Sequence, residues 1–258
     1  MSAGDRTGVG RGAPAAATPE RPAFYAPRGA GLARDLVALL HPPYTAWHLS
    51  YVALGAAAAS SFHLGRLGWA LAAFFLAVGI AAHALDELHG RPLKTGLSDR
   101  ALIALATVGL GGACAIGGVG AATVSATLIP FVLAGAFLVL AYDLELLGGR
   151  LHNDWTFALA WGGFPALTGF WVCALRLEWP GVLVAVACTV LSLAQRRLST
   201  PVRELRRRTI AVAGEQRLDD GRVVELTAAR LLAPLEGALR ALWFGLVLLA
   251  IAFVVLRA

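Results

Sequence analysis

Four ionisable side chains end an otherwise apolar run in the stretch "AHALDELHGRPLKTGLS", residues 82–98. They are His83, Asp86, Glu87 and His89. Successive residues of a helix turn by about 100°, so all four fall on one face. Carboxylates suit Mg²⁺, and added imidazoles suit Zn²⁺ or iron. The stretch therefore indicates either a metal-binding cluster or a polar cap where a membrane helix meets water.

Carboxylates and imidazoles recur at the same predicted depth on two other apolar segments. The stretch "AYDLELLGGRLHND" places Asp143 and Glu145 at the end of one segment. The stretch "HPPYTAWHLSY" places His48 about two turns inside another. Ionisable residues of membrane spans usually face the bundle interior, so we expect one polar basin. Within it, His83, Asp86 and Asp143 are the candidate catalytic residues. The expected ligands of a divalent metal are His48, His83, Asp86, Glu87, His89, Asp143 and Glu145.

Basic and aromatic side chains are expected around this basin. Arginine pairs bidentately with phosphate oxygens, although membrane topology alone also places arginine at this depth. Aromatic faces can hold an isoprenoid chain and stabilise an allylic cation, although they also serve as packing and interfacial residues. The candidate substrate-binding residues are Arg91, Lys94, Arg150, Arg196, Arg197 and Trp161.

The composition is that of a membrane protein. Of the 258 residues, 58% are hydrophobic and only 15% are charged, which is too few charges for a soluble domain of this size. Crossing about 30 Å of hydrocarbon takes roughly 20 apolar residues in a helix. The sequence therefore predicts an all-α, polytopic membrane helical bundle with about seven spans, near Tyr44–Ser61, Leu67–Leu88, Ala101–Gly118, Val119–Tyr142, Trp155–Leu175, Pro180–Ala194 and Leu239–Leu256.

The distribution of basic residues predicts the orientation. All lysines and arginines except Arg66, Arg176 and Arg257 fall on one side of the predicted spans. By the positive-inside rule, the N-terminus is cytoplasmic and the protein is integral to the cytoplasmic membrane. The net charge of +6 is spread over loops that flank the membrane, which favours anionic lipid headgroups and not nucleic acid as the counterpart. The single lysine, Lys94, lies in a loop, which argues against a retinal protein.

Two segments outside the spans are expected to differ in order. Residues 1–34 are rich in Gly, Ala, Pro and Arg and are predicted to form a disordered basic cytoplasmic tail, followed by a short interfacial helix in "GLARDLVALLHPPY". Residues 35–258 form the transmembrane domain, which includes a cytoplasmic loop at 199–234. In that loop a helix is expected to begin at Pro201. The stretch "EQRLDDGRVVEL" is expected to form a hairpin, with a helix leading into Pro234 as the alternative.

These motifs resemble the UbiA superfamily of intramembrane prenyltransferases, over roughly residues 41–198. The matching stretches are "HPPYT", like the family's Arg-Pro opening of the first span; "RPLKTGLS", close to its Arg-Pro-Leu-x-x-Gly; and "AYDLELLGG" with a Gly-rich fifth span. The resemblance implies a helical bundle whose cytoplasm-facing cavity binds a prenyl diphosphate through Mg²⁺. In the family, two Asp-rich motifs hold that metal.

The chain departs from the family pattern at both motifs. The first motif of the family reads Asn-Asp-x-x-Asp-x-x-x-Asp, whereas "AHALDELHG" keeps Asp86 with Ala82 and His83 at the leading positions. The second motif is absent, because "LSLAQRRLSTPVRELRRR" contains no Asp. The family typically has nine spans. One acidic cluster with an Arg-rich partner cannot hold the same set of ions, so either Arg196 and Arg197 replace metal or the reaction differs.

Three functions remain open from the sequence. The first is a UbiA-like enzyme acting on a lipid or isoprenoid at a cytoplasm-facing metal site, by prenyl transfer or allylic diphosphate ionisation, with Mg²⁺ as the metal. The second is a His and carboxylate enzyme with zinc or iron that modifies a lipid without diphosphate chemistry. The third is a non-catalytic lipid-binding or scaffold relative that uses Arg206, Arg207 and Arg208. The acceptor and the oligomeric state stay open.

Overall fold

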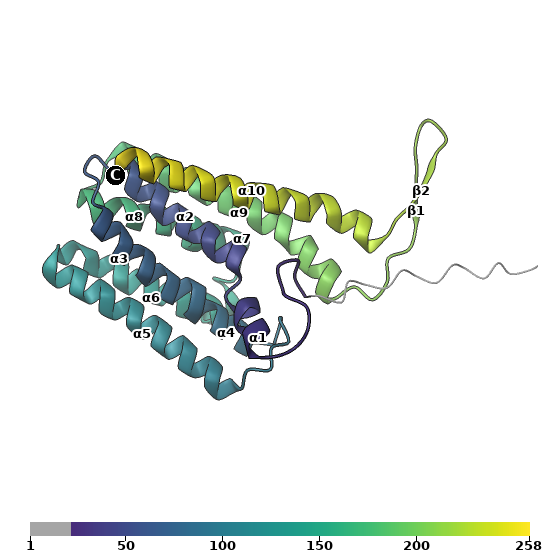
Figure 1. Ribbon diagram of the computed structural model, residues 1–258, viewed down its shortest axis with the longest axis horizontal. Helices are drawn as coiled ribbons and strands as arrows, with labels where there is room; N and C mark the ends of the chain where they lie inside the picture. Colours follow the sequence, from purple (N-terminus) through teal and green to yellow (C-terminus); the bar gives the residue numbers. More distant parts are fainter. Residues whose placement is uncertain (1–21) are drawn as a thin grey trace, which may run out of the picture.

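The computed structural model describes residues 22–258, so most of the predicted tail lies outside the described residues. Within this part of the chain, six helical segments are long and apolar enough to cross a membrane. They are Leu64–Leu88, Asp99–Thr123, Ala126–Asp143, Asp154–Ala174, Trp179–Arg207 and Ala228–Arg257. The predicted all-α polytopic membrane bundle is thus confirmed (Figure 1).

Several spans are built from more than one helical piece. The first long one consists of α3 (Leu64–Phe74), the π-helical segment η1 (Phe75–Ala82) and α4 (His83–Leu88). It is followed by α5 (Asp99–Thr123) and by the 3₁₀ turn η2 (Ala126–Leu128) with α6 (Ile129–Asp143). After the turn η3 (Leu147–Gly149) come α7 (Asp154–Ala158), the π-helical segment η4 (Leu159–Gly163) and α8 (Phe164–Ala174). The last two spans are α9 (Trp179–Arg207) and α10 (Ala228–Arg257).

The first predicted span, Tyr44–Ser61, corresponds to α2 (Pro42–Ala58), which is shorter than the other six. With 17 residues it is at the lower limit for crossing the hydrocarbon. The helix lies inside the bundle, where Trp47 and Tyr51 are fully buried. A Cβ at Gly55 would overlap the carbonyl oxygen of Ala166 in α8, so small residues allow the two helices to approach closely.

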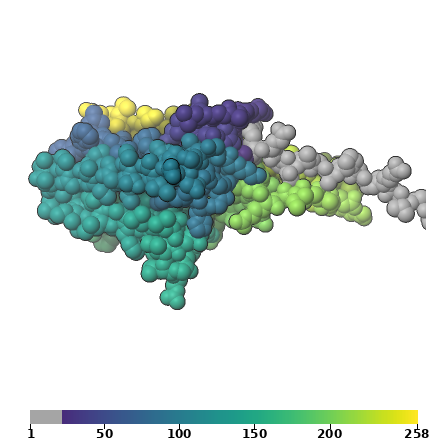
Figure 2. All heavy atoms as spheres, turned by 90° about the horizontal axis from the view of Figure 1, so that it is seen from below, coloured from purple at the N-terminus to yellow at the C-terminus, as the bar shows by residue number. Residues whose placement is uncertain are grey.

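One turn was predicted in the wrong place. The boundary expected at Gly118 and Val119 lies inside α5, and the chain turns only at Val124 and Ser125. A helix inside a membrane tolerates glycine, because each backbone N–H and C=O there must be hydrogen-bonded and the helix supplies those bonds. The hairpin of α5 and α6 forms a broad outer face of the molecule, drawn in blue-green and teal in Figure 2. Large exposed side chains such as Val108, Val119 and Leu133 suit this face for lipid contact.

Consecutive helices run in opposite directions, so one end of the bundle collects the start of α2, the ends of α4, α6 and α9, and the start of α10 (Figure 1). We call it the basic end, because Arg66, Arg176 and Arg257 are the only basic residues near the opposite end in the described part of the chain. The amphipathic helix α1 (Leu32–Leu39) lies at the basic end, as expected, with Leu32 and Leu36 exposed.

The sixth span continues well beyond its predicted end at Ala194. No new helix begins at Pro201, because α9 runs without interruption to Arg207 with Pro201 inside it. The cost of an internal proline is about 3 kcal/mol. That cost is offset by burial, since the extension packs an apolar face on α10 and on the chain before α1. The side chains of this cluster are Phe24, Tyr44, Leu198, Val202, Leu205, Leu232, Leu235 and Leu239.

Residues 199–234 thus contain the end of α9, a hairpin and the start of α10. The predicted hairpin is confirmed, with β1 (Glu215–Arg217) and β2 (Val223–Glu225) pairing antiparallel. The alternative helix into Pro234 is also present, because α10 begins at Ala228 and contains Pro234.

Residues 22–26, which the sequence placed in the disordered tail, pack against the bundle. Ala23 and Ala26 are buried, and the Phe24 ring lies 5.0 Å from the guanidinium carbon of Arg240. The tail prediction is wrong for these residues because the aromatic pair Phe24 and Tyr25 finds apolar partners between α2, α9 and α10.

Candidate functional site

A cavity of about 140 Å³ opens between the helices at the basic end, and we call it the polar cavity. Its walls come from α2, α4, α6, α7, η4 and α9 and from residues 22–25. The ionisable residues that line it are His41, His48, His83, Asp86, Asp143, His152, Arg196, Arg203 and Arg207, together with Tyr25, Tyr44 and Tyr142. Arg203 and Arg207 lie about two and three turns beyond Arg196 on α9, and Tyr25 precedes the first helix. The other residues lie at the depth predicted for the basin.

Four buried polar atoms of the polar cavity have no hydrogen-bond partner within residues 22–258. They are Tyr25 Oη, Tyr142 Oη, Asp143 Oδ2 and Gln195 Oε1. Buried polar groups are nearly always hydrogen-bonded, and exceptions usually mark a functional site, a water or an ion. The concentration of such atoms in one cavity therefore favours a polar ligand there.

Carboxylates and guanidinium groups meet in this cavity. Asp86 on α4 and Asp143 on α6 are close enough for their charges to interact, and Asp86 also interacts with Arg203 and Arg207 of α9. The Arg203 side chain hydrogen-bonds to Thr200 at 3.2 Å but forms no ion pair in the part of the chain that the structure describes. Its positive charge is thus available to an anion in the cavity.

In each of the four cavity histidines, Nδ1 lies within hydrogen-bonding distance of a backbone carbonyl oxygen. Nδ1 lies 2.8 Å from Leu39 O in His41, 2.8 Å from Trp161 O in His48, 3.2 Å from Gly79 O in His83 and 3.3 Å from Tyr142 O in His152. A carbonyl oxygen can only accept, so Nδ1 carries the hydrogen and Nε2 of a neutral ring has a free lone pair. The His41 and His83 rings also lie against each other, with centroids 4.2 Å apart and planes tilted by 33°.

The structure brings together some of the predicted site residues. His48, His83, Asp86, Asp143, Arg196 and Trp161 all line the polar cavity. Glu87, His89, Glu145, Arg91, Lys94, Arg150 and Arg197 do not. Among the latter, Lys94, Arg150 and Arg197 are exposed to solvent, and Arg91 pairs with Asp99.

Glu87 has a different environment from its neighbour Asp86. Its carboxylate is fully buried and accepts hydrogen bonds from Leu93 N at 2.9 Å, Thr95 N at 2.8 Å and Thr95 Oγ1 at 2.9 Å. Asp35 of α1 accepts from Gly96 N at 2.9 Å in the same loop. These two carboxylates therefore hold the loop of "RPLKTG" in place, and both Glu87 oxygens are occupied.

The donor set of the polar cavity fits some metal ions and not others. Within residues 22–258, no three His, Cys, Asp or Glu side chains are grouped so that they could hold a metal together. A catalytic zinc site takes three protein ligands, which this grouping does not supply. Mg²⁺ is usually held by one or two carboxylates plus substrate phosphates, and Asp86 with Asp143 fits that requirement.

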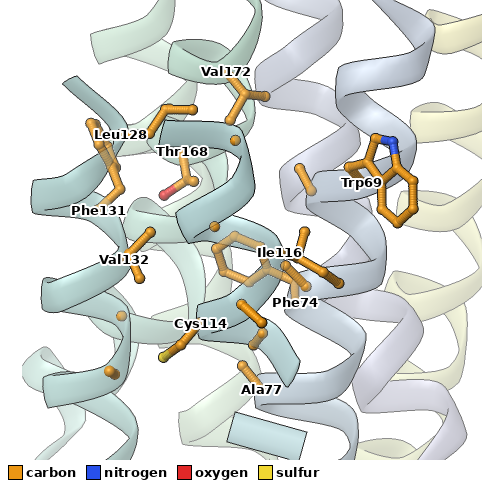
Figure 3. Close-up of a pocket in the computed structure, with 18 of the residues that line it drawn as sticks. Trp69, Phe74, Ala77, Cys114, Ile116, Leu128, Phe131, Val132, Thr168 and Val172 are labelled. Carbon is orange, nitrogen blue, oxygen red and sulfur yellow. The ribbon is translucent and has the colours of Figure 1, made fainter. Parts of the chain in front are cut away.

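A larger apolar cavity of about 440 Å³ lies among α3, η1, α5, α6, η4 and α8. Figure 3 shows the side chains of Phe74, Cys114, Ile116 and Val132 turned toward it. Trp161 lines both this cavity and the polar cavity, so the two cavities share this residue as part of their walls. The volume is within the range of ordinary small-molecule sites, and the lining suits a hydrocarbon chain.

The sequence did not indicate Arg203, and it indicated Arg207 only as part of a scaffold surface with Arg206 and Arg208, not as a cavity residue. Arg203 and Arg207 follow Arg196 by seven and eleven residues, which is a repeat on one helix face. The signal was present, but it appears only when the helix is continued through Pro201. Tyr25 and Gln195 carried no recognisable signal, because one precedes the first helix and the other resembles any polar residue at a helix end.

No protein-family model matches the chain, and the comparisons with curated proteins and with solved structures find no significant match.

Proposed function

We propose that the chain is a UbiA-like integral membrane enzyme that acts on an isoprenoid or related lipid with a phosphate or diphosphate headgroup. The observation that carries this proposal is that a polar cavity and an apolar cavity share Trp161 in their walls. A headgroup in the first cavity and a hydrocarbon tail in the second would belong to one amphipathic molecule.

The headgroup would be held by the arginines of α9. Arg203 and Arg207 both line the cavity and both interact electrostatically with Asp86, and Arg203 forms no ion pair in the described chain. Arg196 hydrogen-bonds to Asp154 at 3.1 Å, which orients its guanidinium over the Phe157 ring. Guanidinium groups bind phosphate oxygens in pairs, so this set suits an anion with several oxygens.

Asp86 and Asp143 would hold a Mg²⁺ ion jointly with the headgroup oxygens. When bound, this ion would neutralise charge on the phosphate oxygens. Asp86 and Asp143, together with Arg196, Arg203 and Arg207, would then bind the headgroup that two Asp-rich motifs bind in the UbiA family.

The reaction would be ionisation of an allylic diphosphate, with or without transfer of the prenyl group. Arg203 and Arg207 would stabilise the negative charge that develops on the leaving diphosphate. The rings of Tyr142, Phe157 and Trp161 form a cluster, with centroids 4.6 Å apart for Tyr142 and Trp161, and their faces would stabilise the allylic cation. The basic end would face the cytoplasm, as the arginine distribution predicts.

Turnover of a radiolabelled prenyl diphosphate by purified protein with Mg²⁺ tests this proposal. We expect the wild type to release diphosphate. Arg203→Ala should lower kcat/KM roughly ten- to hundredfold, the effect of losing a charge-assisted hydrogen bond. Arg197→Ala is the matched control, because Arg197 is exposed on the same helix and should leave turnover unchanged. No consumption by folded wild-type protein, with any acceptor, would refute the proposal.

The two other functions fit the described residues less well. A zinc or iron enzyme needs a set of three protein ligands, and would be supported by stoichiometric metal that is lost in His83→Ala. A scaffold that uses Arg206, Arg207 and Arg208 needs them on one surface. Arg206 instead pairs with buried Glu236, and Arg207 lines the polar cavity.

A further inference from the structure

His48 lies next to Trp161, which belongs to the wall that the polar and apolar cavities share. Its ring lines the polar cavity and is only 4% exposed. Nδ1 lies 2.8 Å from the carbonyl oxygen of Trp161, the residue that lines both cavities. A headgroup in one cavity and a tail in the other would therefore place the bond between them close to this imidazole.

The hydrogen bond to Trp161 fixes the tautomer of His48. The carbonyl oxygen of Trp161 lacks the regular α-helical hydrogen bond, because the residue four positions on is Pro165, which has no N–H. The chain is π-helical at this point, in η4. His48 Nδ1–H donates to this carbonyl. Nε2 then carries no hydrogen and makes no hydrogen bond within residues 22–258, which leaves its lone pair free.

The surroundings distinguish His48 from the other three cavity histidines. Its ring neighbours are Tyr51 and Phe157, each with a centroid distance of 6.2 Å, and neither is charged. The His41 and His83 rings contact each other, and His152 Nδ1 lies 3.9 Å from Glu145 Oε1 near the surface. His48 is therefore the cavity imidazole best placed to act alone as a base toward a hydrocarbon chain.

We propose that His48 Nε2 accepts the proton released in the reaction, an assignment that rests on the proposed function. When the bond from the allylic carbon to the diphosphate oxygen breaks, both electrons leave with diphosphate and the tail becomes a cation. The cation is neutralised by loss of a proton from a neighbouring carbon, whose C–H electrons form the new double bond, or by attack of a hydroxyl acceptor, whose O–H proton is lost. In either case one proton leaves, and the Nε2 lone pair takes it, which converts His48 to imidazolium.

His48→Asn is the first test, because the amide N–H of Asn can still donate toward Trp161 O but the side chain cannot accept a proton. We measure turnover of the labelled prenyl diphosphate and binding of an unreactive prenyl thiolodiphosphate by the same purified protein. The assignment predicts unchanged binding and a kcat lower by roughly 10²- to 10⁴-fold, the usual contribution of a general base. His89→Asn, in an exposed residue outside the cavity, is the control and should match the wild type.

His48→Ala with added imidazole is the second test, which also covers a His48→Asn variant that fails to fold. Partial recovery of turnover by imidazole supports a proton-accepting role, which a packing role would not produce. Wild-type turnover in His48→Asn, or failure of imidazole to restore any turnover in folded His48→Ala, overturns the assignment. Absence of turnover in the wild type contradicts the proposed function itself, and the assignment then falls with it. The product, a diene or a prenylated acceptor, identifies which of the two protons is removed.

Discussion

Replacing Glu87 should damage the fold, whereas replacing its neighbour Asp86 should not. The Glu87 carboxylate accepts hydrogen bonds from two backbone N–H groups and one hydroxyl of the loop that follows α4. Both residues that it binds, Leu93 and Thr95, are themselves buried. Asp86 instead is exposed to solvent within the polar cavity.

The expected loss of stability follows from the number of buried N–H groups that lose their acceptor. Glu87→Ala leaves two buried backbone N–H groups without an acceptor, and each costs about 1–3 kcal/mol. The expected loss is therefore about 2–6 kcal/mol, a large part of the stability of most domains. Glu87→Gln keeps one acceptor oxygen and should lose about half of that. Asp86→Asn removes no structural partner and should unfold like the wild type.

Thermal unfolding and denaturant titration of the purified variants in the same detergent measure these differences. The order of stability should be wild type and Asp86→Asn together, then Glu87→Gln, then Glu87→Ala. If Glu87→Ala proves as stable as the wild type while Asp86→Asn is destabilised, the two carboxylates have been assigned the wrong roles.

Three further results are expected. Gly169→Ala should cost about 1–3 kcal/mol, because its Cβ would overlap a carbonyl oxygen of α2, whereas Gly68→Ala, which meets open space, should unfold like the wild type in denaturant titrations. Burial opposes ionisation of Asp35, but hydrogen bonds from Arg34 and from Gly96 N–H outweigh it and lower the pKa of Asp35 below its ordinary 3.8. The ionised Asp35 carboxylate therefore stabilises the fold fully above pH 3.8, and this stabilisation is lost as the pH falls through the lower folded-state pKa. Thermal unfolding measured down to about pH 3 should show a smaller loss of stability with falling pH in Asp35→Asn than in the wild type. Removal of divalent metal by a chelator should abolish turnover of the prenyl diphosphate and Mg²⁺ should restore it; turnover that is indifferent to the chelator would rule out the metal.

The helices were largely predictable because membrane spans carry their signal in composition. A run of about 20 apolar residues has few alternatives to a helix in a bilayer. The cavity residues His48, His83, Asp86 and Asp143 were also predictable, since ionisable groups at equal depth on different helices tend to face one interior.

The rest of the site depended on tertiary contacts that the sequence does not display. The helical face that Glu87 shares with Asp86 does not reveal that the next loop folds back onto one carboxylate and leaves the other free. Pro201 suggested a helix start, but the packing of Val202 and Leu205 on α10 keeps α9 intact. As a result, Arg203 was placed in a loop and not at the cavity.

Equilibrium binding of a radiolabelled prenyl diphosphate to purified protein, in the presence of Mg²⁺, tests whether the polar cavity holds a diphosphate headgroup. We expect saturable binding that inorganic diphosphate competes away, weakened roughly ten- to hundredfold by Arg203→Ala and unchanged by Arg197→Ala. Binding that responds equally to both substitutions, or no saturable binding by the folded wild type, would contradict this role of the cavity.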